Sequence, residues 1–62
     1  MNNVLEVVAD KTGTKQGDWI LVDGVDSGCG VDYWLENKHT GLRVYANYDQ
    51  GYVSVEVLEY EQ

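Results

Sequence analysis

The feature that most constrains the fold is a succession of three alternating segments in the second half of the chain, separated by two short turns. The segments are VDYWLEN (31–37), LRVYANY (42–48) and YVSVEVLEY (52–60). Apolar and polar residues alternate in each of them, as they do in half-buried β-strands. The intervening turns contain Gly41 and Gly51, which supply the left-handed backbone that tight hairpins require. The pattern predicts a three-stranded antiparallel meander.

Two further apolar runs precede the meander, NVLEVVA (3–9) and DWILVD (18–23). The chain has ten valines, five tyrosines and two tryptophans but no proline. Valine and aromatic residues suit a pleated surface and lose rotamer freedom in helices. We therefore expect both runs to be strands in a single all-β domain over residues 1–62. A chain of this length must share one interior, which predicts a small five-stranded antiparallel barrel or a strongly curved sheet.

Alternation also predicts which side chains share a face of the sheet. Matching the apolar positions of the meander places Val44 beside Leu35 and Val55. The opposite face then carries large aromatic residues together with carboxylates, and Arg43 on it is expected to pair with Glu36 or Glu56 across the strands. The members of that second face are Trp34, Glu36, Arg43, Tyr45, Tyr52, Ser54 and Glu56. Two interpretations stay open: a packed face inside a barrel or dimer, or an exposed surface for a partner.

The stretch DGVDSGCGVD (23–32) is the segment that most resembles a chemical site. As a calcium loop of the EF-hand kind it matches only at its first aspartate, at Ser27 and at Gly28. Cys29 lies between two glycines and is expected to be accessible, but the charged residues near it in the sequence are carboxylates rather than the base or positive charge that activates a thiol. His39, the one histidine, lies in a separate turn. We interpret the stretch as an acidic connection between two strands, with no metal, no cofactor and no enzymatic activity.

The net charge of −7 is unevenly distributed. Residues 23–36 and 44–62 contain no lysine or arginine. Such a negative field repels nucleic acids and anionic membranes and speeds encounter with basic partners, although it also serves plain solubility. No apolar run reaches the ~20 residues of a membrane span, and the N-terminus has no basic region before an apolar stretch. We expect a cytoplasmic protein that is complete from Met1 onward.

The middle of the chain, residues 15–48, resembles an SH3-like domain. The elements that carry the resemblance are Gly17-Asp18 before a hydrophobic strand, the aromatic pair Tyr33-Trp34, the turn Thr40-Gly41 and the closing Asn47-Tyr48. The resemblance implies a five-stranded small barrel. It also implies a peptide-binding role for Tyr33 and Tyr48.

Three functions are open at this point. The first is a non-enzymatic, acidic protein-binding inhibitor that mimics the charge of a nucleic acid, of the anti-CRISPR or anti-restriction type found in phages and mobile elements, with a basic protein as partner. The second is an SH3-like peptide-binding module or a small homodimeric subunit. The third is an enzyme or metal protein that uses Asp23, Asp26 and Cys29. For the first, the expected partner-binding residues are Asp23, Asp26, Asp32, Trp34, Glu36, Tyr45, Tyr52 and Glu56.

Overall fold

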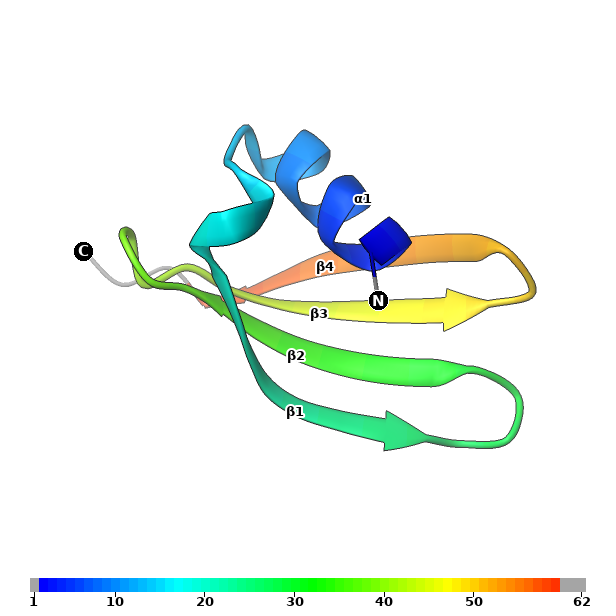
Figure 1. Ribbon diagram of the computed structural model, residues 1–62. Helices are drawn as coiled ribbons and strands as arrows, with labels where there is room; N and C mark the ends of the chain where they lie inside the picture. Colours follow the sequence, from blue (N-terminus) through cyan, green and yellow to red (C-terminus); the bar gives the residue numbers. More distant parts are fainter. Residues whose placement is uncertain (1, 60–62) are drawn as a thin grey trace.

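The computed structural model describes residues 2–59 and contains one helix followed by four strands (Figure 1). The elements are α1 (Asn2–Thr12), the short 3₁₀ turn η1 (Gln16–Asp18), β1 (Trp19–Asp26), β2 (Val31–Asn37), β3 (Arg43–Asp49) and β4 (Tyr52–Glu59). The strands form one antiparallel sheet in the order β1-β2-β3-β4. The mostly β character is confirmed. The five-stranded barrel is wrong, because the sheet has four strands and stays open.

The predicted strand over residues 3–9 is wrong, because this segment belongs to α1. Val4 and Val8 are four residues apart and therefore lie on one side of a helix, where both are buried. Glu6 and Asp10 are exposed on the other side. The valine content of the segment suggests a strand, but burial of this one apolar side against the sheet outweighs that preference.

The end of α1 has a clear local cause. Gly13 adopts a left-handed backbone with φ of +68°. The backbone N–H of Thr14 then donates to the carbonyl of Ala9 at 2.9 Å, which satisfies a carbonyl that the last helical turn leaves without a partner. This turn sends the chain through η1 into β1.

The helix lies across one face of the sheet, mainly over β3 and β4 (Figure 1). We call this the inner face and the opposite one the outer face. Side chains from the helix and from the inner face form the core between them. The buried apolar residues are Val4, Val8, Ala9, Trp19, Leu35, Leu42, Val44 and Ala46. The helix therefore supplies the cover that a closed barrel would have provided, and it covers one face only.

The predicted meander is confirmed over the described residues, with Tyr60 of the third segment lying outside them. Gly41 and Gly51 both have positive φ, as predicted. Gln50 also has a positive φ, of 50°, so that Gln50 and Gly51 form a two-residue hairpin turn whose twist suits the flanking strands. This turn brings Asp49 opposite Tyr52 and thereby sets the register of β3 against β4.

The register confirms the predicted faces and corrects one pairing. Val44 lies opposite Leu35, as expected. On β4, however, Val44 lies opposite Val57 rather than Val55, which instead pairs with Ala46. The position of the turn shifts the pairing by two residues, so the same side chains still face the helix.

The glycine-rich acidic stretch connects two strands, but most of it is strand itself. β1 continues to Asp26 instead of ending at residue 23, and only residues 27–30 form the turn. The Ser27 N–H donates to the carbonyl of Gly30 at 3.0 Å, and the Gly28 N–H donates to a carboxylate oxygen of Asp26 at 3.0 Å. The aspartates of this stretch therefore lie on or beside an ordered hairpin.

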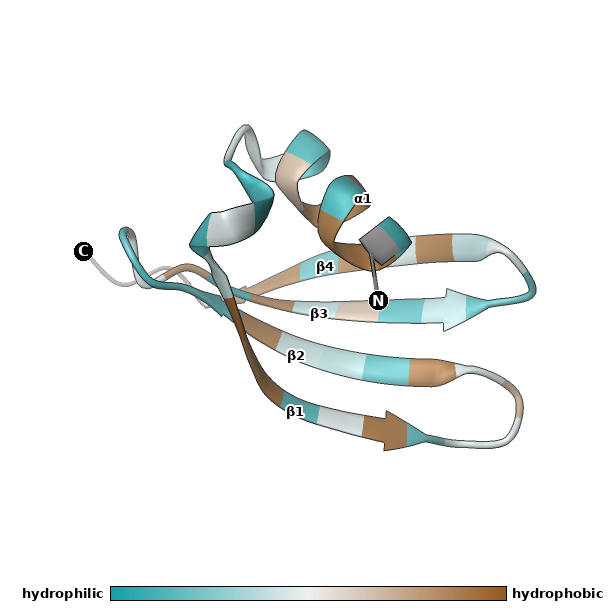
Figure 2. Ribbon diagram, in the orientation of Figure 1, coloured by the Kyte–Doolittle hydropathy of each residue, from teal (hydrophilic) through white to brown (hydrophobic). Residues whose placement is uncertain are grey.

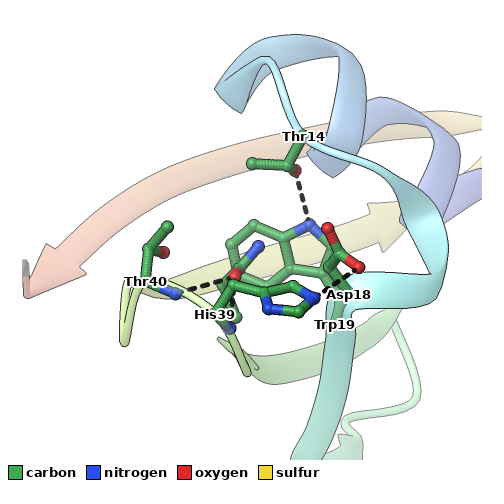
Figure 3. A network of polar contacts seen from close by, with 6 residues as sticks. Thr14, Asp18, Trp19, His39 and Thr40 are labelled. Atoms are coloured by element: carbon green, nitrogen blue, oxygen red, sulfur yellow. Dashed lines mark hydrogen bonds and ion pairs between the residues drawn. The ribbon is translucent and has the colours of Figure 1, made fainter.

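A polar cluster joins the turn between β2 and β3 to the start of β1 (Figure 3). Buried Asn37 accepts the backbone N–H groups of His39 and Thr40 through its Oδ1 atom, at 2.9 and 3.1 Å. The His39 Nε2 atom lies 3.2 Å from an oxygen of Asp18, and the Trp19 indole N–H donates to the Thr14 hydroxyl at 2.8 Å. These contacts hold the turn between β2 and β3 against the segment that connects α1 to β1, which gives the cluster a structural role.

Candidate protein-binding face

The centre of the outer face is a row of four side chains, one from each strand. Asp23 pairs with Trp34, Trp34 with Tyr45, and Tyr45 with Glu56. Directly opposed side chains on neighbouring antiparallel strands lie about 5 Å apart. Two aromatic rings are therefore flanked by a carboxylate on each side, and we call this set the acidic–aromatic row.

The aromatic centre of the row is ordered by contact between its rings. The ring centroids of Trp34 and Tyr45 are 5.3 Å apart, with their planes tilted by 49°. Both side chains are only partly buried, because α1 lies on the other side of the sheet and no second element of residues 2–59 packs on this face. Aromatic groups presented in this way are typical of protein-binding surfaces.

A hydrogen-bond network fixes the tyrosine of the row. The Tyr45 hydroxyl and the Asn47 side-chain amide each donate to the same oxygen of Asp32 at 2.6 Å. The Tyr45 hydroxyl bond, followed by that of Asn47, lowers the pKa of the Asp32 carboxyl. The same bond raises the pKa of Tyr45, and desolvation and the nearby carboxylate charges raise it further. Asp32 therefore remains ionised while Tyr45 remains a neutral donor.

The one arginine of the chain lies next to the row and is bound to a glutamate. The Arg43 Nε atom lies 2.9 Å from a Glu36 carboxylate oxygen across β2 and β3. This confirms the predicted cross-strand pair and selects Glu36 over Glu56 as its partner. Because the two charges balance, the negative charge of the outer face comes from its other carboxylates, chiefly those of Asp23, Asp32 and Glu56.

Exposed apolar side chains surround the row. Hydrophobic residues follow β1 along much of its length (Figure 2), and Val22 there is 63% exposed. Tyr52 on β4 is 81% exposed. The large apolar residues left exposed at outer-face positions are Ile20, Val22, Val25, Tyr52 and Leu58. Only Tyr52 was among the predicted site residues, although the uninterrupted run of residues 20–22 indicated a strand that is apolar on both faces.

Each edge strand contains one extra residue, and both extra residues line one hollow of the outer face. Val22 is unpaired in β1, between the pairs formed by Leu21 and Asp23. Leu58 is the corresponding residue in β4, opposite the step from Arg43 to Val44. The hollow has a volume of about 420 Å³. It is lined by Val22, Asp23, Trp34, Leu35, Arg43, Val44 and Leu58.

The structure brings most of the predicted partner-binding residues together. Seven of the eight occupy outer-face positions: Asp23, Asp32, Trp34, Glu36, Tyr45, Tyr52 and Glu56. Asp26 is the exception. It pairs with Val31 in the register of the inner face, and its carboxylate accepts the N–H of Gly28 in the hairpin turn.

The alternative chemistry around Cys29 is not assembled. Cys29 is exposed in the turn between β1 and β2, whereas His39 lies in the turn between β2 and β3, at the opposite end of the seven-residue strand β2 (Figure 1). Among residues 2–59, no group of three histidine, cysteine or acidic side chains could hold a metal ion. Within the same residues, α1 is too short to cross a membrane.

Comparison of the chain with protein-family models, with curated proteins and with solved structures finds no match. The SH3-like resemblance therefore stays a prediction, and the five-stranded barrel that it implied is not the observed fold.

Proposed function

We propose that this chain is a non-enzymatic, acidic protein-binding inhibitor whose outer face docks on the basic surface of a nucleic-acid-handling protein. The observation that carries the proposal is the acidic–aromatic row on a sheet face that the helix leaves uncovered. Its carboxylates stand in for phosphates, and its rings provide the apolar anchors of the interface.

The spacing of the row supports this role. Four strands about 4.8 Å apart separate Asp23 from Glu56 by roughly 14 Å across the sheet. Between them lie Trp34 and Tyr45, whose rings bury apolar area at little entropic cost when a partner covers them. Carboxylates at both ends steer a basic partner toward these rings.

Small proteins that block a nucleic-acid-binding site by charge mimicry are typical of phages and mobile elements, which use them in the cytoplasm against host defence. We therefore propose an anti-CRISPR or anti-restriction type of role, with a basic groove as the target. The net charge of −7 and the two segments without lysine or arginine support this choice.

A second candidate function is a homodimeric or peptide-binding interaction module. The observation that favours it is the exposed apolar set on the edge strands, especially Val22 and Leu58. An interface built on these residues would resist salt, because burial of apolar area is its main source of affinity.

The test compares two double variants that remove the same charge from different places. Asp23→Asn with Glu56→Gln neutralises the ends of the row. Glu6→Gln with Asp10→Asn neutralises two exposed carboxylates of α1. Tagged proteins are incubated with bacterial lysate at 50 and 500 mM salt, with and without duplex DNA as competitor, and the bound proteins are quantified.

We expect the wild type and the helix variant to capture the same basic nucleic-acid-binding protein, and salt or DNA to release it. The row variant should bind it about tenfold more weakly, since each exposed ion pair contributes up to about 1 kcal/mol. Equal binding by both double variants would contradict the proposal. A concentration-dependent dimer on sizing, unaffected by salt, would instead favour the second candidate function.

A further inference from the structure

The hollow of the outer face is shaped by both edges of the sheet. A β-bulge bends its strand and re-aims the side chains next to it. The extra residues of the two irregularities, Val22 in β1 and Leu58 in β4, line opposite sides of the hollow. Trp34 lies between them on β2. The hollow therefore has two aliphatic walls and an aromatic surface.

The charges around the hollow select its occupant. Asp23 lines it, and its Oδ1 atom accepts the Gly24 N–H at 2.8 Å, which holds the carboxylate in place. Arg43 also lines it, but its Nε atom is bound to Glu36 at 2.9 Å. The hollow thus presents the carboxylate of Asp23 beside Trp34, while the charge of Arg43 is balanced by Glu36.

We infer that the hollow receives one arginine side chain from the basic partner; this inference rests on the proposed function and names the group that the partner inserts. The arginine stem would contact the walls formed by Val22 and Leu58, and its guanidinium would stack on Trp34. The same planar group can donate hydrogen bonds to Asp23.

Other occupants satisfy the hollow less well. A leucine or a phenylalanine would fill the apolar part but would remove water from the Asp23 carboxylate without replacing its hydrogen bonds, which is costly. A second copy of this acidic chain would bring further carboxylates to the hollow. Arginine matches the walls, the ring and the charge together.

The experiment is an NMR titration of ¹⁵N-labelled protein with three capped tripeptides, Gly-Arg-Gly, Gly-citrulline-Gly and Gly-Leu-Gly. Citrulline keeps the length and planarity of arginine but carries no charge. The variants are Asp23→Asn, which keeps an oxygen able to accept the Gly24 N–H, and Asp10→Asn on α1, which makes the same chemical change away from the hollow.

We expect the arginine peptide to cause saturable shifts at Val22, Asp23, Leu58 and the Trp34 indole N–H. The citrulline and leucine peptides should bind at least fivefold more weakly. Asp23→Asn should weaken the arginine peptide about fivefold, as expected for one exposed ion pair, and Asp10→Asn should leave it unchanged.

Four results would overturn the inference, and the first three concern the peptides: no shifts at the hollow, equal binding of the leucine or citrulline peptide, and equal effects of Asp23→Asn and Asp10→Asn. Shifts of the hollow residues that depend on protein concentration without peptide would assign the hollow to a second copy, which also overturns it. None of the first three results changes whether the acidic–aromatic row captures a basic partner in the pull-down. A failure of this inference is therefore distinguishable from a failure of the proposed function.

Discussion

The two faces of the sheet are built from the same strands but have different chemistry. Leu35 and Trp34 are neighbours on β2 and point to opposite faces. Leu35 is 1% exposed beneath the helix and packs with the aliphatic residues Val44 and Ala46. Trp34 packs against Tyr45 and stays partly exposed between carboxylates. Compact aliphatic side chains allow the helix to approach one face, whereas carboxylates beside the rings make an intramolecular cover costly on the other.

The largest effect is expected on the inner face. Leu35→Ala should lower the free energy of unfolding by about 3 kcal/mol, because it opens a cavity between the helix and the sheet. That loss is a large fraction of the stability of a chain of 62 residues. Urea unfolding followed by tryptophan fluorescence measures it. A loss below about 1 kcal/mol would mean that the helix does not pack on this face as described.

Trp34→Ala is the matched change on the outer face and should separate stability from binding. It removes one ring contact, so the free energy of unfolding should fall by only about 1 kcal/mol. Binding of the captured partner should be lost, as for a central aromatic anchor. Urea unfolding and the pull-down measure the two effects on the same protein. A stability loss as large as that of Leu35→Ala would show that the outer face is part of the core.

The smallest effect concerns the pH dependence of the outer face. The lowered pKa of Asp32 means that its ionised form is favoured by folding, so it contributes stability above its unfolded pKa of about 3.9. This contribution is lost as the pH falls through the lower pKa of the folded state. Tyr45→Phe removes the main hydrogen bond, should raise the pKa of Asp32 toward its ordinary value and should reduce this contribution to stability.

Carboxyl NMR titration of Asp32 and unfolding midpoints between about pH 2 and 6 measure this change. Tyr52→Phe provides the control, because it removes a hydroxyl from an exposed tyrosine of the same face. If both variants shift the Asp32 titration equally, the bond to Tyr45 is not the cause of the lowered pKa.

Local patterns were sufficient for the part of the fold built from neighbouring segments. Alternation within the three segments of residues 31–59 and glycine at two short turns predicted the three-stranded meander and the division of its side chains between two faces. The same alternation predicted that Arg43 pairs with Glu36 or Glu56, and the structure decided for Glu36. These features depend on the two-residue period of a strand and on the residue types in a turn, and both are present within short stretches of sequence.

The N-terminal segment was predicted wrongly because propensity and spacing disagree there. Its valines favour a strand, while the four-residue interval between Val4 and Val8 favours a helix. The bulges at Val22 and Leu58 were also missed, and with them the hollow. A bulge leaves no reliable trace in alternation, since it arises from how two strands accommodate each other.

The sequence by itself determined the composition of each strand face, the positions of the hairpin turns and the excess of negative charge. The tertiary structure decided which face is covered, because only packing reveals that residues 2–12 fold as a helix and lie over β3 and β4. It also decided the pairing that places Asp23, Trp34, Tyr45 and Glu56 in one row. Periodicity assigns a side chain to a face, whereas its neighbours across the sheet depend on register, which is set where distant strands meet.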